Sequence, residues 1–512
     1  MEHTGTRSAT FAAMCRTTTF VALFGLVLPA IAKAQEAPKR QIEATIAGAG
    51  KDTIYLANYY GSKLYYADTA IADARGKAVF HSLKGYAAGL YAIVAPGPRF
   101  FQVLVNEPMI KLATDTTDLL KHLEVKVSKE NQVYLDYIRY LDDRKKERDQ
   151  LRTQMDKQQD APGRNGFKPQ LEDLDTAVKA YQNELIANNP GTLVAAMVKM
   201  SMAVELPEIR KADGSLDSAA QYYQYRAHYW DNVDLTDERI VRLPDFANKF
   251  DEYIGRTVPQ VPDTINALAD ALIGRTDGRN EVFKYMVNTI THKYETSDIM
   301  GMDAVFVHMA LTYFCPNGAT PGRVDWMPAD KLEKLCERAH KQAPLVLGRK
   351  APYLCLTDTT EEQWINFYDL PQEYVAIIFW DPHCGVCKKE LPEWARVYKE
   401  KMKALDIEVY CVAKAVDSTL MKDWKAFIRE HDLDWVNVGL TQHVFQEAKK
   451  DPRKYIPKLT TIESLNYADT YDVYSTPKIF LVDGERRFRG KQLSPEQVVD
   501  LVTRSKERKP KE

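Results

Sequence analysis

Phe379–Pro392, with the sequence FWDPHCGVCKKELP, begins at the end of an apolar run from Tyr374 to Trp380. An apolar run of this length predicts a buried strand, and the charged residues that follow predict a helix. The strand delivers Cys384 and Cys387 to the start of that helix. A helix N-terminus carries about half a positive charge, which stabilises a thiolate, and the thiolate is the form of cysteine that attacks. This arrangement predicts a reactive dithiol and thiol–disulfide chemistry.

The composition is that of a globular protein of several domains. The chain has 512 residues, of which 45% are hydrophobic and 27% charged, and its formal net charge is -2. A chain of this length predicts about three domains. The balanced charge gives no basis for binding nucleic acid or an anionic membrane surface. We expect no nucleic-acid partner and no cofactor.

The first 34 residues differ from the rest and predict export. Arg7 and Arg16 precede an apolar stretch, Phe20–Ile31, which ends at Ala32-Lys33-Ala34. This order is typical of a signal peptide, and we expect cleavage after Ala34. The stretch is short for a membrane span, although a membrane anchor is the alternative. We therefore predict a location in the periplasm or cell envelope, with no stable membrane span after cleavage.

Six of the seven cysteines follow this segment, too few for a disulfide scaffold in a chain this long. One close-spaced pair in an exported chain favours a catalytic dithiol. Cys315 and Cys336 flank a Pro/Gly-rich loop, and whether they pair is left open. Zinc would need two further ligands at suitable spacing, and none is present, so the prediction for metals is none.

Three regions follow the leader. Residues 35–127 contain alternating runs such as Lys77–His81 and predict an all-β, sandwich-like domain, with a hairpin turn at Asp73–Gly76. Residues 128–343 show helical spacing and predict an all-α domain, in which the charged stretch Asp142–Gln150 forms a solvated helix face. His292, His308 and His340 fall in this region without the spacing of metal ligands.

Residues 344–512 alternate strands with helices and predict an α/β domain. The expected strands are Tyr353–Leu356, Tyr374–Trp380, Ile407–Ala413 and Lys478–Val482, and the expected helices are Lys388–Met402, Leu420–His431 and Ser494–Val502. The segment His443–Thr470 is expected to be an insertion near the site, and a cap for a partner or for the substrate is one role for it.

This last region resembles the thioredoxin superfamily, and more closely the exported, membrane-associated group used in cytochrome c maturation and envelope thiol reduction. The matching features are Phe379-Trp380 before the pair, Cys384-Gly385-Val386-Cys387, Lys388-Lys389-Glu390, Pro392 within the helix, and Thr476-Pro477 before the next strand. The likeness covers the chain from about Leu347 onward and implies a thioredoxin-like fold. The upstream regions are similar to parts of long, multi-domain envelope thioredoxins of Gram-negative bacteria.

The motif and the resemblance together suggest roles for seven residues. Cys384 is expected to be the exposed nucleophile and Cys387 the buried thiol that resolves the mixed disulfide, the two forming the redox-active disulfide. The resemblance implies a cis Pro477 facing the dithiol. It also implies that the Thr476 backbone pairs with an extended substrate.

The remaining three residues have weaker assignments. The resemblance implies that Glu390 exchanges protons with Cys387, and an ordinary solvated helix residue is the alternative. Trp380 and His383 complete the predicted substrate-binding set. His383 is either an ordinary surface residue or, when protonated, a group that stabilises the thiolate.

The favoured function is an exported thiol–disulfide oxidoreductase that exchanges disulfides with envelope proteins, as a reductant. Its partners would be protein dithiols or disulfides and a membrane thiol that donates or accepts electrons. A peroxidase is the first alternative, but the Pro-x-x-x-Thr-x-x-Cys pattern of peroxiredoxins would place its Pro at Ile377 and its Thr at Asp381. The second alternative is a non-enzymatic interaction protein whose dithiol senses redox state. The residues alone do not define the reduction potential.

Overall fold

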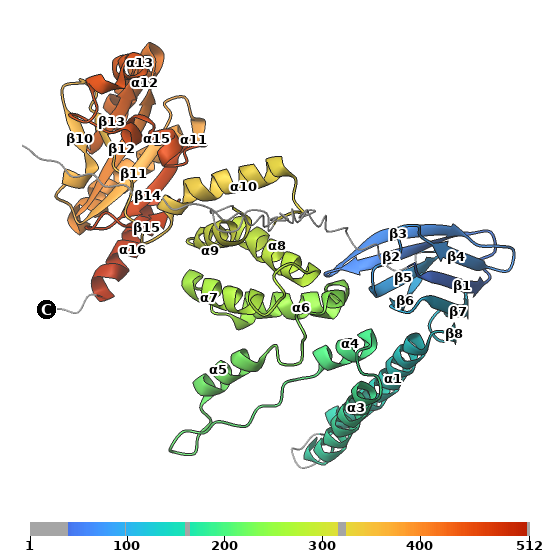
Figure 1. The fold of residues 1–512 in the computed structure, drawn as a ribbon. Helices are drawn as coiled ribbons and strands as arrows, with labels where there is room; N and C mark the ends of the chain where they lie inside the picture. Colours follow the sequence, from blue (N-terminus) through green and yellow to red (C-terminus); the bar gives the residue numbers. More distant parts are fainter. Residues whose placement is uncertain (1–38, 98, 159–163, 316–323, 509–512) are drawn as a thin grey trace, which may run out of the picture.

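The computed structural model describes residues 39–97, 99–158, 164–315 and 324–508, so the expected leader over 1–34 lies outside the described residues. The chain is multidomain, as predicted. Two β-sheets lie at one end, helices occupy the middle, and an α/β unit with a thioredoxin-like fold forms the other end (Figure 1).

The N-terminal region is a sandwich of two four-stranded sheets. One sheet has the order β4-β1-β7-β8 and the other β3-β2-β5-β6. Alternating residues such as Ile42, Ile54, Val103 and Ile110 point inward from both sheets into one core. The strands are β1 (Gln41–Ala47), β2 (Thr53–Tyr60), β3 (Lys63–Ile71), β4 (Lys77–His81), β5 (Gly89–Ala95), β6 (Arg99–Val105), β7 (Met109–Asp115) and β8 (Glu124–Val127).

The predicted hairpin at Asp73–Gly76 is wrong, although the turn itself is present. The Asp73 carboxylate accepts the N–H groups of Arg75 and Lys77, and Gly76 has a positive φ of 80°. The turn nevertheless joins β3 of one sheet to β4 of the other. Alternation shows which residues face a core, but it does not show which strands pair.

The middle region is helical, as predicted. Its core contains large aromatic side chains, including Trp230, Phe246, Phe250 and Phe283. The α-helices are α1 (Lys129–Asp156), α3 (Lys168–Asn188), α4 (Leu193–Ser201), α5 (Ser218–His228), α6 (Pro244–Glu252), α7 (Pro262–Ile273), α8 (Glu281–Glu295), α9 (Asp303–Met309) and α10 (Ala329–Gln342). Shorter turns of other helical types are η1 (Glu238–Arg242), η2 (Tyr253–Thr257), η3 (Ala310–Phe314) and η4 (Ala343–Leu345).

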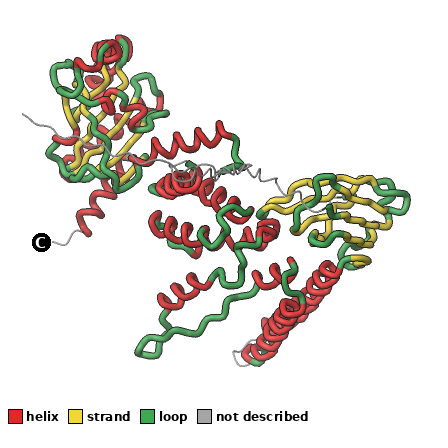
Figure 2. The backbone as a smooth tube through the Cα atoms, viewed as in Figure 1, coloured by secondary structure: helices red, strands yellow, loops and turns green. Residues whose placement is uncertain are grey.

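Two further features of this region concern the charged stretch and the pair Cys315 and Cys336. The helices α1 and α3 run side by side and extend away from the other helices, with α1 carrying the charged stretch (Figures 1 and 2). Cys315 and Cys336 form a disulfide that ties the end of η3 to α10.

Among the described residues, no helix is long and apolar enough to cross a membrane.

The C-terminal region is built on a seven-stranded sheet with the order β10-β9-β13-β12-β11-β14-β15. The interior strand β11 (Tyr374–Trp380) is buried along its whole length. It pairs in parallel with β12 and antiparallel with β14. The other strands are β9 (Cys355–Thr357), β10 (Trp364–Asn366), β12 (Ile407–Ala415), β13 (Val436–Thr441), β14 (Lys478–Val482) and β15 (Phe488–Lys491). The predicted strands are all present to within a few residues.

Helices cover both faces of this sheet. Ile378 and Trp380 of β11 share one core with residues of α11 (Gly385–Val397), α12 (Ser418–His431) and α16 (Pro495–Arg508). Ile377 and Phe379 face the opposite core. The short turns of this region are η5 (Phe367–Asp369), η6 (Tyr398–Met402), η7 (Lys403–Leu405) and η8 (Pro452–Lys454).

The segment His443–Thr470 forms part of that second core. It contains most of α13 (Gln442–Lys450) and all of α14 (Ile462–Leu465) and α15 (Tyr467–Thr470). The Tyr467 ring stacks on Phe379 with centroids 5.4 Å apart. A role as a cap over the dithiol is not seen, because this segment covers a face of the sheet.

Candidate functional site

The dithiol motif begins where β11 ends. The Asp381 carboxylate accepts the N–H of His383 at 2.8 Å, and the Asp381 carbonyl accepts the N–H of Cys384 at 2.9 Å. These bonds close a tight turn between the strand and α11. Cys384 occupies the N-cap position of α11, where its Sγ accepts the N–H of Cys387 at 3.3 Å. A sulfur atom thus takes the place of the oxygen that usually caps a helix.

Cys384 has the environment of a nucleophile. Its side chain is half-buried, and this burial tends to raise the pKa of the thiol. Hydrogen bonds to the side chains of Cys387 and Thr476, and from the backbone N–H groups of Cys387 and Val386, outweigh that effect and lower the pKa of Cys384 below its ordinary value. Cys384 therefore has more thiolate at neutral pH than an ordinary cysteine has.

Cys387 lies one turn further along α11 and has the opposite character. It is fully buried in the core shared with Trp380. Burial, followed by the hydrogen bond to Cys384, raises the pKa of Cys387 to about 12. The first turn of the helix therefore presents one reactive thiol at the surface and holds a protonated one beneath it.

The loop before β14 lies against the dithiol. The Thr476-Pro477 peptide bond is cis, as the resemblance implied. The Cys384 thiol donates to the Thr476 carbonyl with a sulfur–oxygen distance of 3.3 Å. In the described part of the chain, no hydrogen bond reaches the Thr476 N–H. That N–H is available to an extended segment placed beside the loop.

Glu390 lies on the same side as this loop without contacting the thiols. Its side chain is exposed and lines a groove with Trp394 and Pro477, between α11 and the start of α16. No hydrogen bond joins Glu390 to Cys384 or Cys387 within the described residues. Glu390 is therefore not placed to exchange a proton directly with Cys387 in this conformation. The predicted role would need a bridging water molecule.

His383 is exposed next to Cys384, and its side chain has a specific partner. Its Nε2 lies 2.9 Å from the Asp423 carboxylate of α12. On the other side of the turn, the Asp381 carboxylate pairs with Lys414 at 3.1 Å. The charge of a protonated His383 would therefore be shared with a carboxylate, which weakens its effect on the thiolate.

The assignment of Trp380 to substrate binding is wrong. Its side chain is only 1% exposed and packs against Phe427, with ring centroids 5.0 Å apart. The alternation along β11 directs Trp380 into the core beneath α11, where no substrate can contact it. This orientation depends on the register of the strand.

Sequence reasoning missed several residues around the site. Asp423 and Lys414 pair with motif residues but come from α12 and β12. Lys341 of α10 donates to the hydroxyl of Tyr474 at 3.2 Å, two residues before Thr476. Only proximity in the folded chain identifies these residues, since no local pattern marks them. Among the described residues, no cluster of three or more His, Cys, Asp or Glu side chains could hold a metal ion.

Comparisons with known proteins find a family match in the C-terminal region. The model of the AhpC/TSA family matches residues 347–488. No curated protein matches the chain. A domain of a possible thiol-disulfide isomerase from Cytophaga hutchinsonii is 29% identical, covering 32% of this chain and 96% of that one, with a TM-score of 0.25.

Two further solved structures are similar. The thioredoxin domain of a thiol-disulfide oxidoreductase from Bacteroides vulgatus is 23% identical, covering 31% of this chain and 97% of that one, with a TM-score of 0.25. A thioredoxin-like protein from Bacteroides caccae is 17% identical over 59% of this chain and 97% of that one, with a TM-score of 0.39. The chain thus carries, over residues 347–488, a domain that matches the AhpC/TSA family, and this domain contains both cysteines of the motif.

Proposed function

We propose that this protein is a thiol–disulfide oxidoreductase that uses the Cys384/Cys387 dithiol on polypeptide substrates. The observation that carries the proposal is the contrast between two thiols on one helical turn. The pKa of the half-buried Cys384 is lowered, whereas the pKa of the fully buried Cys387 is raised to about 12. Attack and resolution require this division of roles. The match to the AhpC/TSA family over residues 347–488 supports an enzyme of this class.

The reaction balances as a two-electron exchange. The Cys384 thiolate attacks one sulfur of a substrate disulfide, and the other substrate sulfur leaves as a thiolate and takes a proton. Cys387 then loses its proton and attacks Cys384 of the mixed disulfide, which releases the second substrate thiol. The substrate is reduced to a dithiol, and Cys384 and Cys387 are oxidised to a disulfide. Substrate backbone beside Thr476 would hold the reacting sulfur in line.

We propose that the protein acts as a reductant. The pairing of His383 with Asp423 supports this direction, because a shared imidazolium charge stabilises the thiolate less and makes the disulfide less oxidising. Repeated turnover then needs a thiol donor that reduces the Cys384–Cys387 disulfide. We propose that this donor lies in the membrane and that the leader over residues 1–34 exports the chain to the periplasm or envelope.

We also propose that domain boundaries fall near residues 127 and 343. The first lies between β8 and α1, and the second lies in the short turn η4 that follows α10. The Cys384/Cys387 site would then belong entirely to residues 344–512.

The family match also supports thiol peroxidase activity as a second candidate. The turn before Cys384 argues against it, because the position for the peroxiredoxin Thr holds Asp381. Its carboxylate accepts hydrogen bonds from His383 and Lys414 and cannot donate one to a peroxide.

Disulfide reduction by the mature full-length protein tests the proposal. The reduced protein should reduce a disulfide-bonded peptide stoichiometrically, and Cys384→Ser should abolish this reaction. Cys387→Ser should accumulate the mixed disulfide, which mass spectrometry detects. Cys355→Ser is the matched control, because Cys355 lies in β9 of the same domain.

The same samples separate the alternatives. Consumption of hydrogen peroxide faster than reduction of the peptide would establish the peroxidase instead. Failure of the dithiol to cycle with either substrate would leave a redox-sensing interaction protein. A reduction potential near about -250 mV or lower would support the reductant, and one near about -120 to -180 mV would contradict it.

A further inference from the structure

The β-sandwich has an open edge at β6. This strand is the last in the order β3-β2-β5-β6, so only its β5 side has a strand partner. In an antiparallel pair, the residues of each strand alternate between bonding to the partner and directing their N–H and C=O groups the other way. Half of the β6 residues therefore direct these groups away from the sheet.

Asn131 of α1 identifies the β6 residues whose backbone groups face away from the sheet. The Leu104 N–H donates to the Asn131 side-chain oxygen at 2.8 Å, and the Asn131 amide donates back to the Leu104 carbonyl at 2.8 Å. Leu104 therefore faces away from β5, and Asn131, which is 3% exposed, replaces one residue of a neighbouring strand. By the same alternation, the backbone groups of Gln102 and Phe100 also face outward.

Gln102 and Phe100 have no side chain that bonds to their outward backbone groups as Asn131 does for Leu104. In the described part of the chain, no side chain or backbone group outside the sheet bonds to the N–H or C=O of Gln102 or Phe100. The Gln102 side chain accepts from the Tyr134 hydroxyl and donates to the Tyr59 hydroxyl, so it is not available to its own backbone. The strand thus offers two consecutive outward-facing positions for pairing.

An apolar cavity of about 330 Å³ adjoins these positions. We call it the edge cavity. Its walls come from β6, from β7, β8 and the loop between them, and from α1. They include Phe101, Leu112, Leu123, Val125, Leu135 and Ile138. Phe100 and Leu120 stand at its rim with 50% and 48% of their side chains exposed. This size and lining are typical of a ligand site.

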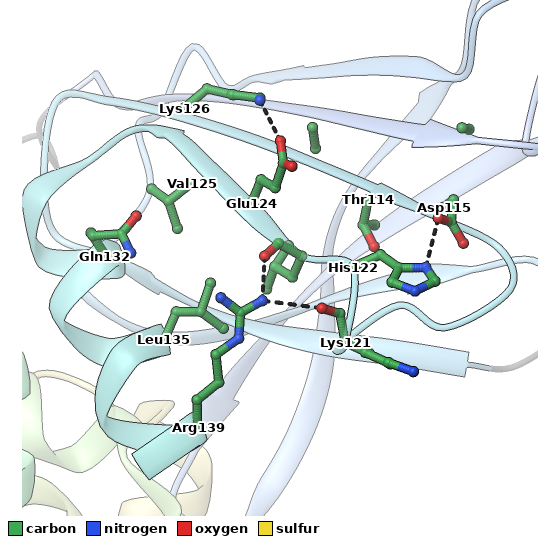
Figure 3. A pocket seen from close by; sticks show the side chains of 13 residues that line it. Thr114, Asp115, Lys121, His122, Glu124, Val125, Lys126, Gln132, Leu135 and Arg139 are labelled. Carbon is green, nitrogen blue, oxygen red and sulfur yellow. Dashed lines mark hydrogen bonds and ion pairs between the residues drawn. The ribbon is translucent and has the colours of Figure 1, made fainter.

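One wall of the edge cavity is held in place from behind. Arg139 of α1 donates to the carbonyls of Lys121 and Leu123 at 3.1 and 2.8 Å, which fastens the loop before β8 to the helix. Figure 3 shows this bracing in the neighbouring hollow, where Leu135 lies beside Arg139. The cavity is therefore a formed feature of the sandwich.

We propose that this edge binds an extended polypeptide segment. The segment adds as a strand beside β6, pairs with the outward N–H and C=O groups of Phe100 and Gln102, and inserts one apolar side chain into the edge cavity. Main-chain bonds would supply affinity, and the cavity would select the side chain. This binding function goes beyond the proposed dithiol chemistry and does not require it.

The unpaired backbone distinguishes a polypeptide from other apolar ligands. An acyl chain would fill the edge cavity but leave the backbone groups of Phe100 and Gln102 without partners. Only a ligand that alternates donors and acceptors along an extended chain satisfies both features at once. An unfolded stretch of protein chain with a leucine or phenylalanine has this chemistry.

Peptide binding by the full-length mature protein tests the proposal. The probe is a fluorescein-labelled peptide of alternating threonine and leucine, flanked by lysines and free of cysteine. The protein carries Cys384→Ser and Cys387→Ser, so that no dithiol reaction contributes. Fluorescence anisotropy should show saturable binding to this background.

Two pairs of variants separate the cavity from the backbone. Leu120→Asp at the rim should weaken binding at least about tenfold, because it places a charge beside the apolar cavity. Leu83→Asp, at a leucine that is 82% exposed elsewhere on the sandwich, should leave binding unchanged. Phe100→Pro removes the outward N–H and should weaken binding at least about fivefold more than Phe100→Val, which keeps it.

Several results would overturn the proposal. These are the absence of saturable binding, equal affinities for Leu120→Asp and Leu83→Asp, or equal affinities for Phe100→Pro and Phe100→Val. Dimers of the parent protein that Leu120→Asp dissociates would assign the edge to a second copy. Competitive displacement by oleate, with no effect of Phe100→Pro, would assign the cavity to an acyl chain. Since the background lacks both thiols, none of these results bears on the proposed oxidoreductase.

Discussion

The sulfur of Cys384 lies 3.3 Å from the carbonyl oxygen of Thr476, although 92 residues separate the two in the chain. The antiparallel pairing of β11 with β14 brings them together, because the motif follows β11 and the cis-Pro477 loop precedes β14. The nucleophile and the backbone that would hold its substrate therefore meet only when the sheet forms.

Alkylation should distinguish the two thiols by pH. Iodoacetamide should modify Cys384 of the reduced protein with a midpoint below the pH at which an ordinary cysteine reacts, because the pKa of Cys384 is lowered. Cys387, with a pKa of about 12 and a buried side chain, should stay unmodified at neutral pH. Peptide mapping by mass spectrometry gives both rates, and similar rates at the two positions would contradict the division of roles.

The stability of the reduced protein should fall in alkaline solution because of Cys387. Its folded pKa of about 12 exceeds the value for an unfolded cysteine, so between about pH 9 and pH 12 the unfolded chain has lost a proton that the folded chain keeps. Stability therefore falls as pH rises through this window, by about 1–3 kcal/mol.

Denaturant titration at several pH values measures this loss. Cys387→Ala should lack the contribution from Cys387. Its free energy of unfolding should therefore fall less between neutral and alkaline pH than that of the parent protein. If the two proteins lose stability in parallel, groups other than Cys387 account for the alkaline effect.

Thr476→Val should raise the pKa of Cys384. The substitution keeps the shape of the side chain but removes the hydroxyl, whose hydrogen bond helps to lower that pKa. The pH profile of alkylation should shift upward, and disulfide reduction at neutral pH should slow by about two- to tenfold. Thr470→Val, at a half-buried threonine in α15 whose hydroxyl donates to the Glu463 carbonyl, is the control and should leave the profile unchanged.

Asp423→Asn should make the dithiol more oxidising. Without the Asp423 carboxylate, the protonated His383 would act on the neighbouring thiolate with its full charge, and the reduction potential should rise by about 5–20 mV. The rise should be larger at about pH 5.5 than at about pH 8, because only the imidazolium is charged.

Equilibration in glutathione buffers at both pH values measures the shift. Glu430→Gln removes the same charge from the same helix, at a side chain that is 72% exposed, and serves as the control. Equal shifts in the two variants would show a general charge effect with no special contribution from the His383–Asp423 pair.

The Cys315–Cys336 disulfide should stabilise the helical region. It closes a loop of 21 residues, for which the chain-entropy model gives about 3 kcal/mol. The double variant Cys315→Ser/Cys336→Ser should lower the melting temperature of this region in calorimetry. Single variants should destabilise it to a similar extent, and unchanged melting would contradict a structural role.

Much of the C-terminal region could be predicted from local pattern. The apolar run at Tyr374–Trp380 and the run at Lys478–Val482 each became a strand with the predicted bounds, because few alternatives exist for short apolar segments between turn signals. Strand partners could not be read in this way. The turn at Asp73–Gly76 was recognised, but its strands lie in different sheets.

The sequence by itself determined that two cysteines stand at the start of a helix after a buried strand, because the periodicity and spacing are local properties. Tertiary structure decided which groups surround those cysteines. It buried Trp380 and Cys387, paired His383 with Asp423, and brought Thr476 to the sulfur of Cys384. Solvent exposure, hydrogen-bond partners and pKa depend on neighbours from distant parts of the chain, and the packing of the sheet with its helices selects those neighbours.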